Sequence, residues 1–209
     1  MRLQAHAASR AVGMPTECPA KPPALPLNGK EKPMPRLPYI TDRQAGDTPL
    51  VAAIRLRRGG GLLNLDRQLL YSPAFAQGWN ALLGAVRTQL KVDPRLRELA
   101  MCVVAVLNGA EYEYVHHAPE FVKAGGKEEQ IAAVHRMSSH DIDASLFDEL
   151  ENATIALSAQ MTTDVKVQDA TFETLRKHLG EAATVELVGV VAAYNMVSRF
   201  LVALGIEPE

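Results

Sequence analysis

The sequence is poor in cysteine, and its two cysteines form no motif. Cys18 and Cys102 are the only cysteines among 209 residues, and no C-x-x-C pair occurs. Two cysteines so far apart give no disulfide framework, and without a C-x-x-C pair there is no dithiol redox motif. The reducing cytoplasm is therefore the expected location.

The sequence also lacks an excess of charge and any long apolar run. Lysine and arginine number 22 against 24 for aspartate and glutamate, so the net charge is -2. A nucleic-acid-binding protein needs a cationic surface to displace counterions from phosphates. The longest apolar runs, Leu99–Leu107 and Leu187–Val197, are far shorter than the roughly 20 residues that span a bilayer. We expect a soluble protein with no nucleic-acid or membrane partner and no secretory signal.

Proline is concentrated at the start of the chain, where the first 38 residues hold eight of the 13 prolines. Proline at this density removes backbone donors and blocks helices. We interpret residues 1–33 as a disordered extension that is dispensable for folding, and residues 34–209 as one domain. The segment Met34–Ile40 is expected to be an extended arm laid on the core. Met14 and Met34 are alternative first residues of the natural chain.

The rest of the chain carries helix signals. Aromatic residues make up only 5% of the sequence, and no segment alternates with period two. A capping residue followed by proline starts a helix at Thr48, Ser72 and Asp93, and glycines end several helices. The sequence predicts an all-α fold of seven to eight helices. The predicted helices cover 49–58, 73–86, 95–110, 111–124, 127–137, 143–161, 168–179 and 182–204.

Two of these predicted helices, 95–110 and 182–204, are apolar nearly all the way round. A surface helix normally carries a single apolar stripe. A domain of this size can bury about one fully apolar helix. We therefore expect one apolar face to pack against another subunit in a homo-oligomer.

Three ionisable residues in adjacent predicted helices are candidates for catalysis. Glu98 has Met101 and Cys102 as helical neighbours, so burial should raise its pKa. Glu113 and His117 are one turn apart and share a helix face. A tight turn between the helices would let Glu98 meet His117 directly or through a water. This set is typical of general acid–base chemistry, with His117 as the principal acid or base, Glu113 orienting it, and Glu98 supplying or withdrawing a proton.

Structural readings of the same residues remain open. Glu98 could simply be a first-turn acid that favours the helix dipole, and Glu113 with His117 could be a surface pair worth about 0.2–0.5 kcal/mol. Cys102 is either a buried hydrophobe or a reactive thiol. Asn195 and Arg199 either bind a carboxylate or hold a helix junction together by hydrogen bonds.

The walls of the expected pocket are assigned to aromatic residues. Trp79 and Tyr112 are expected to bind substrate there. His116 is placed at the rim or at a subunit edge, because adjacent helical residues point about 100° apart and so His116 and His117 cannot both line one pocket. No spacing of His or acidic residues supplies enough ligands for a metal. We expect neither a metal nor another cofactor.

The window from Arg95 to His117 resembles the carboxymuconolactone decarboxylase family, which includes the alkylhydroperoxidase D-like proteins. Redox members of that family carry Glu, eleven residues, Cys, two residues, Cys, three residues and His. In this sequence Glu98 and His117 stand at the Glu and His positions, whereas Ala110 and Glu113 replace the cysteines.

The replacement segment is similar to the non-redox branch of the family, whose members often carry Tyr-Glu-Trp-x-x-His. Tyr112, Glu113 and His117 match that pattern, and Tyr114 departs from its Trp. The similarity extends from about Met34 to the last residue.

The resemblance implies an alkylhydroperoxidase D-like helical bundle that forms trimers or hexamers. It implies an acid–base enzyme acting on a small carboxylated or carbonyl-bearing metabolite, of decarboxylase, lyase or isomerase type. Two alternatives stay open. One is a peroxidase-related antioxidant protein with peroxiredoxin activity, and the other is a non-catalytic oligomer that binds a ligand.

Overall fold

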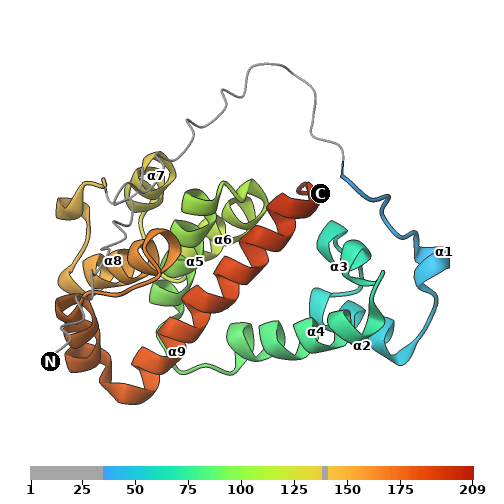
Figure 1. Ribbon diagram of the computed structural model, residues 1–209, viewed down its shortest axis with the longest axis horizontal. Helices are drawn as coiled ribbons and strands as arrows, with labels where there is room; N and C mark the ends of the chain where they lie inside the picture. The colour runs from blue at the N-terminus through green and yellow to red at the C-terminus, as the bar shows by residue number, and fades with distance from the viewer. Residues whose placement is uncertain (1–34, 138–140) are drawn as a thin grey trace, which may run out of the picture. The chain divides into compact units, whose positions relative to one another are not determined.

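The computed structural model describes residues 35–137 and 141–209, and the expectations for residues 1–33 lie outside this range. Within it the chain forms nine α-helices, one short 3₁₀ helix and no strand, which confirms the all-α class (Figure 1). The helices are α1 (Asp42–Ala45), α2 (Pro49–Arg58), α3 (Asn64–Leu69), α4 (Pro73–Thr88), α5 (Pro94–Asn108), α6 (Glu111–Lys123), α7 (Glu128–Arg136), α8 (Glu149–Thr163) and α9 (Asp169–Leu204).

Two of the three predicted capping residues bind the helix start with their side chains, whereas Ser72 precedes Pro73 of α4 without such a hydrogen bond. The Thr48 hydroxyl accepts a hydrogen bond from the Val51 amide at the start of α2, and the Asp93 carboxylate accepts one from the Arg95 amide at the start of α5. Gly59 ends α2 in the left-handed region, at φ 82°. Such caps satisfy backbone groups that a helix end leaves unpaired.

Some helix boundaries differ from the prediction. Helix α8 begins at Glu149, not at Asp143, because Asp148 and Glu151 form a capping box there. The predicted division between 168–179 and 182–204, by contrast, is present within α9 as a break in the helix at Gly180, where φ is 72° and ψ is 172°. Helices α1 and α3 were not predicted, since they are too short to show an apolar period.

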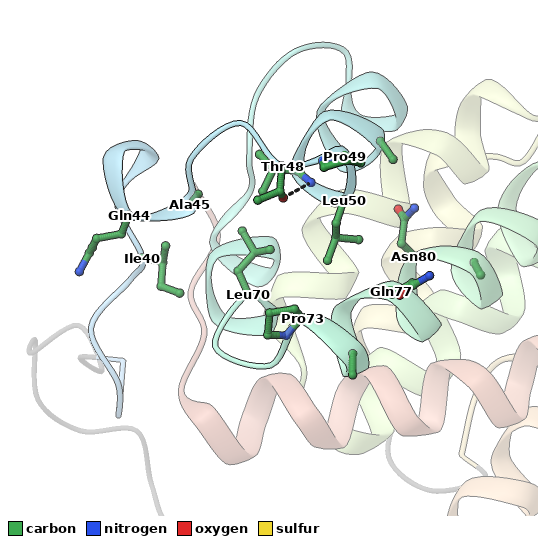
Figure 2. A pocket seen from close by; sticks show the side chains of 14 residues that line it. Ile40, Gln44, Ala45, Thr48, Pro49, Leu50, Leu70, Pro73, Gln77 and Asn80 are labelled. Carbon is green, nitrogen blue, oxygen red and sulfur yellow. Dashed lines mark hydrogen bonds between the residues drawn. The ribbon is translucent and has the colours of Figure 1, made fainter.

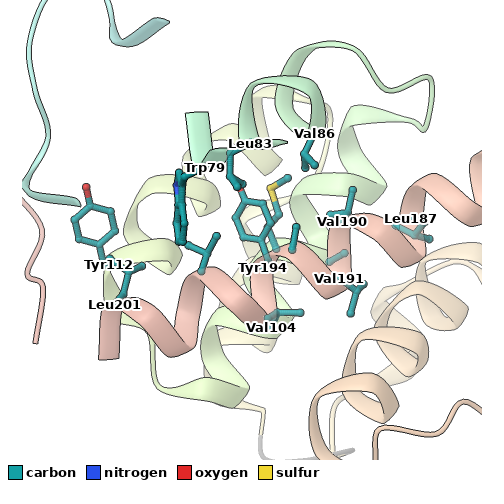
Figure 3. Close-up of a cluster of buried hydrophobic side chains, with 14 of the residues drawn as sticks. Trp79, Leu83, Val86, Val104, Tyr112, Leu187, Val190, Val191, Tyr194 and Leu201 are labelled. Atoms are coloured by element: carbon teal, nitrogen blue, oxygen red, sulfur yellow. The ribbon is translucent and has the colours of Figure 1, made fainter. Parts of the chain in front are cut away.

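Helix α5 is the centre of the domain. It packs against α6, α7, α8 and α9, and every residue from Glu98 to Ala105 is buried. A second apolar layer joins α4 to α9, where Trp79 and Leu83 face Val190 and Tyr194 (Figure 3). One chain therefore buries the central part of α5, Glu98–Ala105, as expected for one of the two apolar helices.

Helix α9 is only partly covered. It is long and apolar enough to cross a membrane by length and composition, but half of its most apolar window is buried inside the protein, as in the core helix of a globular domain. On its outer face, Val185 is 70% exposed and Val202 is 48% exposed. Phe75 and Leu82 of α4 are also exposed. Folding of one chain thus leaves several apolar side chains of α4 and α9 exposed to solvent.

The arm before α1 contains no helix over its described residues 35–40 and bends at residues 36 and 37. Its backbone carbonyls accept hydrogen bonds from side chains of α3 and the residues that follow it: Gln68 donates to Leu37, and Tyr71 donates to Pro38. The Arg36 amide donates to the Leu204 carbonyl at the end of α9. The arm thus ties the first helices to the last.

Candidate acid–base site

The turn between α5 and α6 brings the predicted residues together. Gly109 adopts φ 67°, a left-handed conformation that favours glycine, and its amide donates to the Val106 carbonyl. Helix α6 then runs back along α5. As a result, Glu98 of α5 lies opposite His117 of α6.

His117 makes three close polar contacts, and all four side chains involved are buried. Its Nδ1 lies 2.6 Å from Oε2 of Glu98. Its Nε2 lies 3.0 Å from the hydroxyl of Tyr194 and 3.1 Å from Oε2 of Glu113. The expected meeting of Glu98 with His117 is therefore direct, without a bridging water, and the surface-pair reading of Glu113 and His117 is wrong.

Tyr194 and Arg87 extend this arrangement from two other helices. Arg87 Nε of α4 donates to the Tyr194 hydroxyl of α9 at 2.9 Å. The Tyr194 ring also meets the His117 ring edge-on, with 5.0 Å between the ring centroids. Neither residue was predicted as part of the site, because each comes from a helix other than α5 and α6.

Each charged group in the cluster stabilises the ionised form of its oppositely charged neighbours. Burial lowers the pKa of His117, but the nearby carboxylates of Glu113 and Glu98 outweigh burial and raise it above its ordinary value. Burial raises the pKa of each carboxyl group, yet His117 outweighs burial and both pKa values fall. Arg97, whose Nε lies 3.3 Å from Glu98 Oε1, adds to the effect on Glu98. The expectation that the pKa of Glu98 is raised is therefore wrong, because desolvation was the only contribution visible from local sequence.

The two carboxylates differ in how they meet the imidazole. Glu98 forms a short hydrogen bond to Nδ1, which fixes a proton on that nitrogen. Glu113 Oε2 is fully buried and pairs with Nε2 at 3.1 Å, a longer contact than that of Glu98 with Nδ1. The two carboxylates therefore lie against opposite nitrogens of one ring.

The cluster faces a cavity of about 300 Å³. Contrary to the expected apolar walls, most of its lining side chains are charged, with three arginines and three glutamates. Asp66 of α3, also missed in the sequence, holds Arg58 at the cavity by two hydrogen bonds of 3.0 and 3.1 Å. The lining residues are Arg58, Leu63, Arg87, Arg97, Glu98, Tyr112, Glu113, His116, His117 and Glu120.

The other predicted pocket residues divide into two groups. Tyr112 lines the cavity, and so does His116. The expectation that the two histidines cannot line one pocket is wrong, because the cavity is wide enough to reach around α6 to His116. Trp79 does not reach the cavity. It packs between Phe75 and Phe200, with ring centroids 5.7 and 5.1 Å away. The prediction that Trp79 contacts the substrate in this cavity is therefore wrong.

Two open alternatives from the sequence are resolved by packing. Cys102 is completely buried, and burial raises the pKa of its thiol well above the ordinary value. Asn195 accepts from Arg199 at 2.6 Å and from Asn108 at 3.2 Å, and it donates to Thr162 at 3.0 Å. Asn195 and Arg199 therefore hold the junction of α5, α8 and α9 together. Among the described residues there is no group of three or more side chains that could hold a metal ion.

A larger hollow of about 950 Å³ lies between the arm, α2 and α4 (Figure 2). Its side chains are mostly apolar, and Gln44, Gln77 and Asn80 are its amide groups. None of the described residues that line it has a titratable side chain. It offers no group for proton transfer, so the smaller cavity is the candidate active site.

The fold is of the alkylhydroperoxidase D-like helical type. An uncharacterized peroxidase-related protein from Ralstonia eutropha JMP134, described as an alkylhydroperoxidase AhpD core, is similar with a TM-score of 0.68 and 17% identity, over 85% of this chain and 93% of that one. A model of the Carboxymuconolactone decarboxylase family matches residues 73–145 and confirms the resemblance.

Two further solved structures share the fold. An uncharacterized peroxidase-related protein from Silicibacter sp. TM1040 is 18% identical with a TM-score of 0.66, over 87% of this chain and 96% of that chain. A cysteine-to-alanine variant of the debrominase Bmp8, in complex with 2,3,4-tribromopyrrole, is 16% identical with a TM-score of 0.65, over 82% of this chain and 90% of that one. No curated protein matches the sequence.

Proposed function

We propose that the protein is an acid–base enzyme that moves protons on a small carboxylated or carbonyl-bearing metabolite, in a reaction of decarboxylase, lyase or isomerase type. The observation that carries this proposal is the buried His117 imidazole, whose nitrogens lie 2.6 Å from Glu98 Oε2 and 3.1 Å from Glu113 Oε2 at the cavity. A base and an acid placed side by side can remove a proton from one substrate atom and return it to another.

The geometry favours roles that differ from those expected from the sequence. Glu113 takes the proton from the substrate, because it lies at the cavity beside the ring nitrogen that does not bind Glu98. His117 donates from Nε2, and Glu98 holds the Nδ1 proton and so orients the ring. Tyr194 and Arg87 support the Nε2 side.

The charge of the cluster supports an anionic substrate. Cationic His117, Arg87 and Arg97 against Glu98 and Glu113 leave one net positive charge at the cavity. Arginine presents several donors in a planar fork that matches a carboxylate. A carboxylate on the substrate would balance the site, and a carbonyl beside the reacting carbon would have its developing negative charge stabilised.

Proton exchange into deuterated water tests the proposal. 2-Oxoglutarate, oxaloacetate and levulinate are incubated with the protein in D₂O, and loss of the proton signal beside the carbonyl is followed by NMR. We expect exchange with at least one compound and a fall of about 10²–10⁴-fold in Glu113→Gln. Glu111→Gln, an exposed position on the same helix, should keep the wild-type rate. Equal exchange in wild type and Glu113→Gln, or none in wild type, would contradict the proposal.

A thiol-peroxidase function has less support. Two similar structures are described as peroxidase-related, and a thiol mechanism requires a reachable thiolate. Cys102, the one cysteine in the described part of the chain, is buried, its pKa is raised, and it does not line the cavity. The acid–base residues are the better supported machinery.

The proposal includes an assembly and a location. The exposed apolar side chains of α4 and α9, which include Phe75, Leu82, Val185 and Val202, support a homo-oligomer. We propose a trimer or hexamer, as the family resemblance implies. Its partner is a small-molecule substrate in the cytoplasm, with no cofactor.

A further inference from the structure

The side chain of Glu209 reaches the mouth of the charged cavity. Its Oε1 accepts a hydrogen bond from the Asn64 backbone amide at 2.6 Å and from the Tyr112 hydroxyl at 3.2 Å. Its Oε2 lies 3.2 Å from His116 Nε2. Tyr112 and His116 both line the cavity. One carboxylate of the chain is thus bound by three groups at the edge of the candidate active site.

These three groups are held in place by contacts other than Glu209. Tyr112 is only 4% exposed, and its ring stacks on His116 with 4.5 Å between centroids. His116 Nδ1 lies 2.6 Å from the Tyr112 carbonyl oxygen. Both ring nitrogens of His116 therefore face oxygen atoms. The groups form a rigid, prearranged site for an anion.

Glu209 itself is bound at this site less firmly than the segment that carries it. Ile206 is buried, the Glu207 amide donates to the Tyr39 hydroxyl, and the Asn64 side-chain amide donates to the Glu207 carbonyl. The Glu209 side chain is more than one-third exposed, at 37%. It can rotate into solvent while the preceding residues stay anchored.

We propose that the Asn64 amide, the Tyr112 hydroxyl and His116 form a carboxylate-binding subsite at the mouth of the cavity, and that Glu209 is an internal occupant which a ligand carboxylate displaces. This inference rests on the proposed function for the cavity as the ligand site. It adds an anchoring point on the far side of His116 from the reacting groups. It also makes Glu209 a competitor that sets how tightly carboxylates bind.

The Glu209 carboxylate competes strongly with a free ligand because it belongs to the same chain as the subsite. A group held on a short flexible segment has an effective concentration in the millimolar range. The apparent dissociation constant of a ligand equals its intrinsic dissociation constant divided by the fraction of protein molecules in which the subsite is free. Removing the Glu209 carboxylate should therefore tighten the binding of a weak carboxylate by about 5–10-fold.

Succinate titrations test the proposal without any turnover. Binding to wild type, Glu209→Ala and Glu111→Ala is followed by NMR of the His116 ring. Both variants replace one glutamate by alanine, and Glu111 lies on the same helix as Tyr112 but does not line the cavity. We expect succinate to bind Glu209→Ala about 5–10-fold more tightly than wild type, and Glu111→Ala to bind like wild type.

A double variant assigns the gain to the subsite. Tyr112→Phe introduced into Glu209→Ala should reverse most of the tightening, because it removes one donor. No tightening in Glu209→Ala, equal tightening in Glu111→Ala, or no succinate binding by any protein would overturn the inference. If the proposed function fails instead, proton exchange is absent while the Glu209-dependent change in succinate binding persists.

Discussion

The two hollows of the protein differ in size and in chemistry. The hollow between the arm, α2 and α4 has about 950 Å³ and no titratable lining residue, whereas the cavity at α5 and α6 has about 300 Å³ and mostly charged lining residues. Larger volume alone favours the first as a ligand site. Buried charges cost desolvation energy that an apolar lining does not, so the composition of the second needs a chemical explanation. The shifted pKa values of Glu98, Glu113 and His117 also favour the charged cavity as the functional site.

The comparison also shows how the charged cavity is kept stable. Glu98 and Glu113 are buried on either side of one imidazole. Removal of that cation would leave Glu113 without its ion-pair partner and Glu98 with Arg97 alone. The amide groups of the apolar hollow carry no such dependence. Substitutions should therefore have very different effects in the two places.

The largest expected effect on stability is that of His117→Ala. The free energy of unfolding should fall by about 3–5 kcal/mol, as when one partner of a buried ion pair is removed. Gln77→Ala in the apolar hollow should change it by less than about 0.5 kcal/mol, because Gln77 is exposed. Urea unfolding followed by circular dichroism measures both. If the free energy of unfolding fell by similar amounts in the two variants, the claim that the two hollows differ in this way would be wrong.

The helical framework of this contrast could be predicted from sequence, because its signals are local. Thr48, Asp93 and Gly59 act within one turn of their own helices. The pairing of Glu98 with His117 could also be anticipated from the short turn between the helices. These features need no knowledge of distant parts of the chain.

The rest of the site depends on long-range packing. Tyr194 and Arg87 come from helices that the sequence does not align with α6, and Asp66 acts through Arg58. The pKa of Glu98 was expected to rise because only its apolar neighbours were visible, and the structure adds Arg97 and His117 around it. Trp79 was assigned to the pocket as an aromatic residue, but packing places it against Phe75 and Phe200.

A smaller effect is expected in the pH dependence of stability. The lowered pKa values of Glu98 and Glu113 stabilise the fold above their ordinary range, near pH 4.3, and this stability is lost as pH falls through the folded values. The raised pKa of His117 stabilises the fold below about pH 6.5, and this stability is lost as pH rises through the folded value.

Stability should therefore be highest at about pH 5–6. In His117→Gln the alkaline decline should be reduced, whereas His178→Gln, an exposed position outside the cavity, should keep it. Urea unfolding at a series of pH values gives both profiles. An identical alkaline decline in wild type and His117→Gln would show that His117 is not its source.

The central claim is that Glu98, Glu113 and His117 titrate as one coupled unit at the charged cavity. NMR titration of the His117 ring tests it most directly, in wild type, Glu98→Gln, Glu113→Gln and the control Glu111→Gln. We expect a wild-type midpoint above the ordinary imidazole value, a lower midpoint in each of the first two variants, and no change in the control. A midpoint at the ordinary value, or one that stays unmoved in both Glu98→Gln and Glu113→Gln, would contradict the account.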